Sequence, residues 1–167
     1  QLGRPLTYGE RRVVEEEGFV PEVYLDTKGV KTYGVGQTGE WIEKGFPAAY
    51  EDHVRRAEGY IPNLTELPEY LQAELIQAEY RGDLGGSPKF RKLFKEGKFE
   101  EAAEEFLDND DYRNSKKEKT GVHKRMQRVA DAVRKYGKQD PVERAGVRTE
   151  EEEGDSLLDA LKDLVGL

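Results

Sequence analysis

The 167-residue sequence contains no cysteine, one methionine and one tryptophan. The absence of cysteine excludes disulfides, thiolate metal sites and a cysteine nucleophile. No apolar run approaches the roughly 18 to 20 residues that span a bilayer, so we expect no membrane insertion. The sequence also lacks the charged and apolar regions of a secretory signal. It begins at Gln1 rather than methionine, which favours a processed product or a piece of a longer protein.

Histidine is also scarce, with only His53 and His123 in the chain. These two residues are far apart in sequence, and no group of His, Asp and Glu has the spacing of a metal site. We therefore expect both histidines at the surface, and we expect neither a metal nor another cofactor.

Basic residues are outnumbered, since 27 Lys and Arg against 35 Asp and Glu leave a net charge of -8. This balance argues against general nucleic-acid binding, which needs a basic surface. Residues 81–148 nevertheless hold 18 basic against 13 acidic residues, whereas residues 1–80 hold 8 against 15. A basic middle segment beside an acidic first segment would suit the binding of an anionic polymer in a cleft. The commoner explanation is a solvated surface of mixed helices.

The first predicted element is a helix over residues 8–17. Thr7 and Glu10 have the spacing of a capping box, and Gly18 is a typical C-terminal stop. Residues 15–17 are three consecutive glutamates at the end of this helix. Acidic residues there are disfavoured by a few tenths of a kcal/mol up to roughly 1 kcal/mol each. This conflict is either accidental or functional.

A β-hairpin is predicted next. Residues 23–25 form a short apolar strand, residues 26–29 have the Asp-first, Gly-last pattern of a type I turn, and residues 30–35 alternate like a second strand. Gly34 and Gly36 weaken the end of that strand, and glycines at such positions mark a bulge or a close backbone approach.

The remainder of the chain has helical patterns. The helices start at a proline in the first helical position or at a cap by Ser87 or Thr120. Their buried faces follow from amphipathic spacing. The helices are predicted over residues 47–60, 68–81, 88–94, 98–107 and 120–136. One small hairpin followed by helices is an α+β plan.

The domain organisation follows from the same patterns. Residues 1–137 are predicted to form one domain, and residues 138–154 read as a polar linker. Residues 155–167 form a short amphipathic pattern, predicted to be a helix. Because such a helix is marginal when isolated, we expect it to dock on the domain or on a partner chain.

Three residues around the hairpin have side chains suited to catalysis. Glu17 ends the first helix, Asp26 opens the turn, and Thr32 lies on the second strand. If the hairpin folds back toward the helix, the three side chains share one cleft. The charged form of a carboxylate is disfavoured at the negative end of a helix, which suits a general acid. Two carboxyl groups with different acidities, one acid and one base, are the arrangement used in glycoside hydrolysis.

The same residues carry a resemblance to a known family. The run Glu-Gly-x5-Tyr-x-Asp-Thr-x-Gly-x2-Thr-x-Gly-x-Gly, residues 17–36, closely resembles the bacteriophage-type lysozymes, the T-even group of peptidoglycan-cleaving endolysins. Residues 90–106 and 125–129 resemble later helices of that family, so the resemblance covers about residues 7–137. It implies a lysozyme-like fold, in which a small N-terminal β-hairpin lobe and a mostly helical C-terminal lobe enclose a cleft.

The resemblance also implies roles for single residues. Glu17 would be the general acid that protonates the leaving oxygen of the β-1,4 bond between N-acetylmuramic acid and N-acetylglucosamine. Asp26 would orient or activate the attacking water and Thr32 would help to hold it, which implies an inverting mechanism. Arg125 falls where the family has a cation paired with the catalytic acid. The family commonly has His at the position of Gln37, and an amide cannot form that residue's ion pair.

Other side chains near the hairpin are candidates for substrate contact. Arg125, Gln37 and Tyr33 are the candidates for binding substrate or for modulating the acid. Tyr33 and Trp41 would stack on sugar rings or simply pack at the rim. The segment 38–67 is shorter than in the T-even type, which alters the cleft.

The resemblance implies a peptidoglycan hydrolase and leaves two alternatives open. One is a lytic transglycosylase, in which Glu17 acts without an activated water and anhydro-muropeptides form. The other is a non-catalytic wall-binding virion module. The expected partner is bacterial peptidoglycan, with further phage virion proteins reached through the C-terminal segment, and the isolated domain is expected to be a monomer. The expected location is a phage virion or the host bacterial cytoplasm, with the cell wall as the target.

Overall fold

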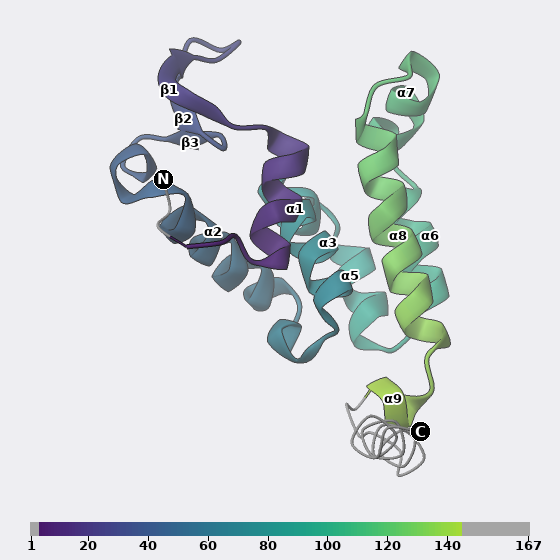
Figure 1. The fold of residues 1–167 in the computed structure, drawn as a ribbon. Helices are drawn as coiled ribbons and strands as arrows, with labels where there is room; N and C mark the ends of the chain where they lie inside the picture. Colours follow the sequence, from purple (N-terminus) through teal and green to yellow (C-terminus); the bar gives the residue numbers. More distant parts are fainter. Residues whose placement is uncertain (1–3, 145–167) are drawn as a thin grey trace, which may run out of the picture. The chain divides into compact units, whose positions relative to one another are not determined.

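The computed structural model describes residues 4–144 (Figure 1). The strands are β1 (Val20–Leu25), β2 (Lys31–Gly34) and β3 (Gln37–Thr38). The helices are α1 (Tyr8–Glu17), α2 (Trp41–Tyr60), the 3-10 turn η1 (Leu64–Glu66), α3 (Glu69–Tyr80), α4 (Asp83–Gly86), α5 (Pro88–Lys95), α6 (Phe99–Leu107), α7 (Asp110–Glu118), α8 (Val122–Lys138) and α9 (Pro141–Arg144). The predicted α+β class is therefore confirmed. No helix within residues 4–144 is long and apolar enough to cross a membrane.

The chain divides into two units, residues 1–137 and 138–167. In the second unit, α9 starts within the predicted polar linker, and the Asp140 carboxylate accepts the backbone N–H of Val142 at 2.8 Å. The predicted C-terminal helix over residues 155–167 lies outside the described residues.

The predicted capping box forms at the start of α1. Thr7 accepts the Glu10 backbone N–H at 3.2 Å, and the Glu10 carboxylate accepts the Thr7 backbone N–H at 2.8 Å. Arg4 adds an ion pair to Glu10 at 2.7 Å, and the Glu10 side chain is almost fully buried. At the other end, Gly18 has a φ of 75°, a backbone conformation that favours glycine and lets the chain leave the helix for β1.

The sheet is antiparallel in the order β1-β2-β3. Tyr24 of β1 pairs with Thr32 of β2, and Thr32 also pairs with Thr38 of β3. The predicted turn is present, since the Gly29 N–H donates to the Asp26 carbonyl at 2.9 Å. The short strand β3 was not predicted from the sequence. Figure 1 shows the sheet beyond the C-terminal end of α1.

Two apolar clusters hold this unit together. The larger one unites the helices, with Leu75, Phe90, Phe106 and Val133 among its fully buried members. The smaller one brings together Val13 of α1, Val35 of the β2–β3 turn and Phe46 of α2. This smaller cluster fixes the sheet against α1 and α2, and it therefore determines where the hairpin residues lie.

Several helix boundaries differ from the predictions. The helix predicted from residue 47 begins at Trp41, and Gly45, with φ 81° and ψ 171°, interrupts it before Pro47. Ser87 makes no side-chain capping hydrogen bond to α5. In the first turn of α8, Ser115 rather than Thr120 accepts the His123 backbone N–H, at 2.8 Å.

Candidate active site

Glu17 is the last residue of α1, and it is joined to a distant helix. Nη1 of Arg125, from α8, donates to Oε1 of Glu17 at 2.8 Å. The same guanidinium binds the preceding residue, with Nε 2.8 Å from the Glu16 carboxylate and Nη2 donating to the Glu16 carbonyl. Arg125 thus supplies a positive charge to the carbonyl end of α1, where a cation is favourable.

Glu16 lies at the centre of a larger charge cluster. Arg128 of α8 forms a second ion pair with Glu16, and Arg12 of α1 approaches it to 3.7 Å. Arg12 also binds Glu74 of α3 at 2.8 Å. Burial raises the pKa of Glu74, and the neighbouring Arg12 opposes this shift. The unfavourable position of the glutamates is therefore compensated by three arginines, one from α1 and two from α8.

Asp26 and Thr32 take part in the hairpin's own hydrogen bonds. Oδ1 of Asp26 accepts the backbone N–H groups of Lys28 and Val30 at 2.8 and 2.9 Å. The buried Thr32 hydroxyl donates to the Val30 carbonyl at 3.1 Å. Among the described residues, no hydrogen bond or ion pair joins Glu17 to either side chain. Oδ2 of Asp26 has no hydrogen-bond partner in the part of the chain that the structure describes.

Gln37 is buried and contacts backbone rather than the charged residues of the site. Its Oε1 accepts the Val35 N–H at 3.0 Å, and its Nε2 donates to the Val35 carbonyl at 3.1 Å. A Cβ at Gly34 would lie 2.4 Å from Oε1 of Gln37, so a side chain rather than another backbone segment lies close to this glycine. No hydrogen bond in the described structure links Gln37 to Arg125 or Glu17.

The two aromatic candidates occupy different surroundings. Tyr33 is half-buried and packs edge-on against Phe19, with 6.4 Å between ring centroids. Trp41 is half-buried at the start of α2, with the Lys44 ammonium 4.7 Å from its ring centroid. Of these two, only Trp41 lines the pocket that lies between the sheet and α2.

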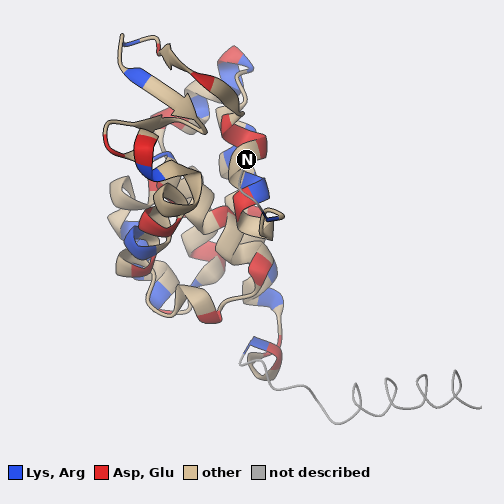
Figure 2. Ribbon diagram, turned by 60° about the vertical axis from the view of Figure 1, so that its left-hand side comes forward, with Lys and Arg blue, Asp and Glu red and all other residues tan. Residues whose placement is uncertain are grey.

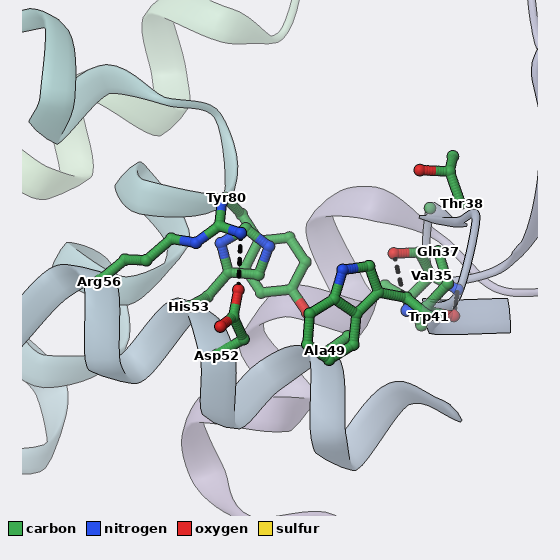
Figure 3. Close-up of a pocket in the computed structure, with 10 residues that line it drawn as sticks. Val35, Gln37, Thr38, Trp41, Ala49, Asp52, His53, Arg56 and Tyr80 are labelled. Carbon is green, nitrogen blue, oxygen red and sulfur yellow. Dashed lines mark hydrogen bonds and ion pairs between the residues drawn. The ribbon is translucent and has the colours of Figure 1, made fainter. Parts of the chain in front are cut away.

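This pocket has a volume of about 250 Å³ (Figure 3). The β2–β3 turn, α2 and the end of α3 form its walls. Its lining residues are Val35, Gly36, Gln37, Thr38, Trp41, Ala49, Asp52, His53, Arg56 and Tyr80. Figure 3 shows Asp52 and Arg56 paired on one side, at 2.7 Å, and the indole of Trp41 on the other.

Tyr80 lines this pocket from the end of α3. Its hydroxyl is buried and has no hydrogen-bond partner within residues 4–144. Burial raises the pKa of Tyr80, and the nearby Tyr50 and the charge of Glu17 raise it further. The ring of His53 stacks on the Tyr80 ring with centroids 3.8 Å apart. Glu17 itself is not among the residues that line the pocket.

The expectation that both histidines lie at the surface was wrong. His53 is half-buried, and burial together with the nearby Arg56 lowers its pKa to about 4. His53 is therefore uncharged at neutral pH, and its 4.0 Å approach to Glu79 is not an ion pair there. His123 is also half-buried, and its ring Nδ1 lies 3.1 Å from Oγ of Ser115.

Sequence reasoning missed Tyr80 and His53 as site residues, and it gave Glu16 no partner. Tyr80 ends a mostly apolar stretch just before Arg81 and Gly82. This pattern only weakly indicates a helix that ends at a cleft. Nothing in the local sequence indicates that His53 would stack on it. No group of three or more His, Asp or Glu residues in the described ranges could hold a metal ion.

No protein-family model and no curated protein matches this chain.

Proposed function

We propose that this protein is a peptidoglycan hydrolase of the lysozyme type, a muramidase that cleaves the β-1,4 bond between N-acetylmuramic acid and N-acetylglucosamine. The observation that carries the proposal is the ion pair between Arg125 and Glu17, separated by 108 residues in the sequence. The resemblance to T-even phage lysozymes implies a cation at this place beside the catalytic acid. The small sheet set against a helical remainder is consistent with the layout of that family.

In this proposal Glu17 protonates the leaving glycosidic oxygen. Arg125 fixes its carboxyl group at the end of α1 and offsets the unfavourable charge at that helix end. Asp26, through its second oxygen, orients a water molecule on the opposite face of the sugar, and Thr32 supports the strand that carries this arrangement. Inversion requires the two carboxyl groups to stand roughly 6.5 to 9.5 Å apart, so that water fits between sugar and base.

The pocket beside Tyr80 suits one sugar ring. Pockets for such ligands combine aromatic or apolar walls with a few polar groups that fix orientation. Trp41 and Tyr80 provide aromatic surface here, while Asp52 and Arg56 provide hydrogen-bonding groups at the edge. We propose that a saccharide unit next to the cleaved bond binds in this pocket.

One observation favours a second candidate, a lytic transglycosylase. Oδ1 of Asp26 and the hydroxyl of Thr32 are both engaged within the hairpin. If these residues only shape the turn, Glu17 acts without an activated water and the sugar's own 6-hydroxyl closes an anhydro ring.

The biological setting of the proposal is phage infection. The enzyme would act on the bacterial cell wall from a phage virion or from the host cytoplasm, as a monomeric domain. Its C-terminal segment would contact other virion proteins.

The catalytic assignment is tested with Glu17→Gln. This variant is expected to retain its fold and to lose release of soluble fragments from purified peptidoglycan, because an amide cannot donate the required proton. Glu15→Gln is the matched control, since Glu15 is 63% exposed two residues earlier in the same helix. Wild-type release by Glu17→Gln would contradict the role of Glu17.

A further inference from the structure

A second pocket, of about 430 Å³, lies where the end of α2 meets α5. Gly59 and Tyr60 contribute from α2, and Pro88 opens the α5 side. This pocket shares no lining residue with the one beside Tyr80, so the proposed glycosidase activity does not account for it.

Three cationic side chains line this pocket, namely Arg91, Lys92 and Lys95 of α5. The one carboxylate in the lining, Glu96, is already bound by Lys98 at 3.0 Å and lies 4.0 Å from Lys92. Lys95 has no ion pair with another described residue. In a chain with a net charge of -8, this pocket therefore carries a local excess of positive charge, which attracts anions.

Arg91 is held in place yet retains hydrogen-bonding capacity. Its guanidinium lies over the Tyr60 ring, 4.6 Å from the centroid. Its Nε is buried and has no hydrogen-bond partner within residues 4–144. The terminal nitrogens of the guanidinium also make no hydrogen bond or ion pair with another described residue, so they can donate to a ligand in the pocket. The planar guanidinium suits oxyanions, and stacking on the ring reduces the flexibility lost on binding.

We infer that the pocket between α2 and α5 binds the phosphate group of a small phosphate monoester or diester. Three cations suit a phosphate, with up to two negative charges, better than a single carboxylate. The volume exceeds what a bare phosphate ion fills, and the rings of Tyr60 and Pro88 offer apolar surface to the carbon part of an ester.

The test measures binding of glycerol 3-phosphate by isothermal titration calorimetry at low salt. Wild type is expected to bind saturably, and Arg91→Gln to bind about tenfold more weakly, which corresponds to about 1.4 kcal/mol. Gly59→Leu is expected to block binding without disturbing the fold, because a Cβ at Gly59 meets no atom within 4 Å. Lys117→Gln, which removes an exposed lysine of α7 away from the pocket, is the matched control and should bind like wild type.

Two further arms identify the source of the phosphate. Inorganic phosphate tests the free ion, and sedimentation with phosphatidylglycerol vesicles, against phosphatidylcholine vesicles, tests a lipid headgroup. Binding in any arm that depends on Arg91 and is blocked by Gly59→Leu supports the inference. Absence of saturable binding in all arms up to about 10 mM phosphate, or equal weakening by Lys117→Gln, overturns it.

Discussion

Glu15, Glu16 and Glu17 are adjacent in the sequence but have different surroundings. The side chain of Glu15 is 63% exposed, that of Glu16 only 15%, and that of Glu17 30%. Glu16 contacts both Arg125 and Arg128, whereas Glu17 contacts Arg125 alone. At the scale of single residues, Glu16 holds the two arginines and Glu17 stays partly open to solvent, which is consistent with the proton-donor role proposed for it.

Glu16→Gln is predicted to destabilise the fold by about 1–3 kcal/mol, because two partly buried arginines lose a charged partner. Glu15→Gln is predicted to change the free energy of unfolding by no more than about 0.5 kcal/mol, as for other exposed sites. Urea unfolding of both variants beside wild type measures the difference. Equal effects of the two substitutions would contradict the central place of Glu16.

His53 gives a prediction that does not depend on function. Burial, with Arg56 nearby, lowers its pKa to about 4, so the native state binds the proton less readily than the unfolded state. The contribution of His53 to stability is therefore lost as the pH falls from about 6.5 toward 4. Titration of the His53 ring signals by NMR should give a midpoint near 4, with His53→Gln used for assignment. A midpoint near 6.5 would mean that the ring is solvated rather than stacked on Tyr80.

At the scale of elements, α1 has the clearest local signals at both ends. The capping box at Thr7 and Glu10 and the stop at Gly18 were readable from the sequence, and the observed helix has the predicted bounds. By contrast α7 was missed, although Asn109 caps it and its first and last turns carry acidic and basic residues respectively. Its polar surface gives little apolar periodicity, which is the signal that sequence reasoning relied on.

The capping box is predicted to contribute measurably to stability. Thr7→Ala should cost about 0.5–2 kcal/mol. The hydrogen bonds from Arg4 lower the pKa of Glu10, so the contribution of Glu10 is present above about pH 4.5 and is lost as the pH falls further. Thermal unfolding of wild type and Glu10→Gln from pH 7 to 3 measures this, and the two should converge at the acid end. A gap that stays constant with pH would contradict the assignment.

The parts of the site that the sequence did not predict depend on tight backbone turns and on contacts between separate elements. Strand β3 depends on Gly34 and Gly36, whose φ values of 63° and 77° fold the chain back tightly, and on the Gln37 amide bound to Val35. The pocket beside Tyr80 depends on contacts between α2 and α3 that no local pattern encodes. The motif from Glu17 to Gly36 therefore indicated the hairpin and the candidate acid, but not the walls of the site.

At the scale of the whole first unit, acidic and basic residues that are far apart in the sequence form ion pairs in the structure. The basic helix α8 supplies Arg125 and Arg128 to the acidic end of α1. Figure 2 shows acidic and basic positions interspersed along the helices rather than gathered on separate faces. The excess of basic residues in the middle of the chain thus has a structural use inside the domain, alongside the pocket at α5.

The central claim, hydrolysis by Glu17 with an activated water, is tested most directly by mass spectrometry of fragments released from purified peptidoglycan. Wild type and Glu17→Gln are compared in parallel, with Glu15→Gln as the control for charge at the helix end. The account predicts reducing muropeptides from wild type and from Glu15→Gln, and none from Glu17→Gln. Anhydro-muropeptides would assign the protein to the transglycosylases, and the absence of fragments from wild type would contradict catalysis altogether.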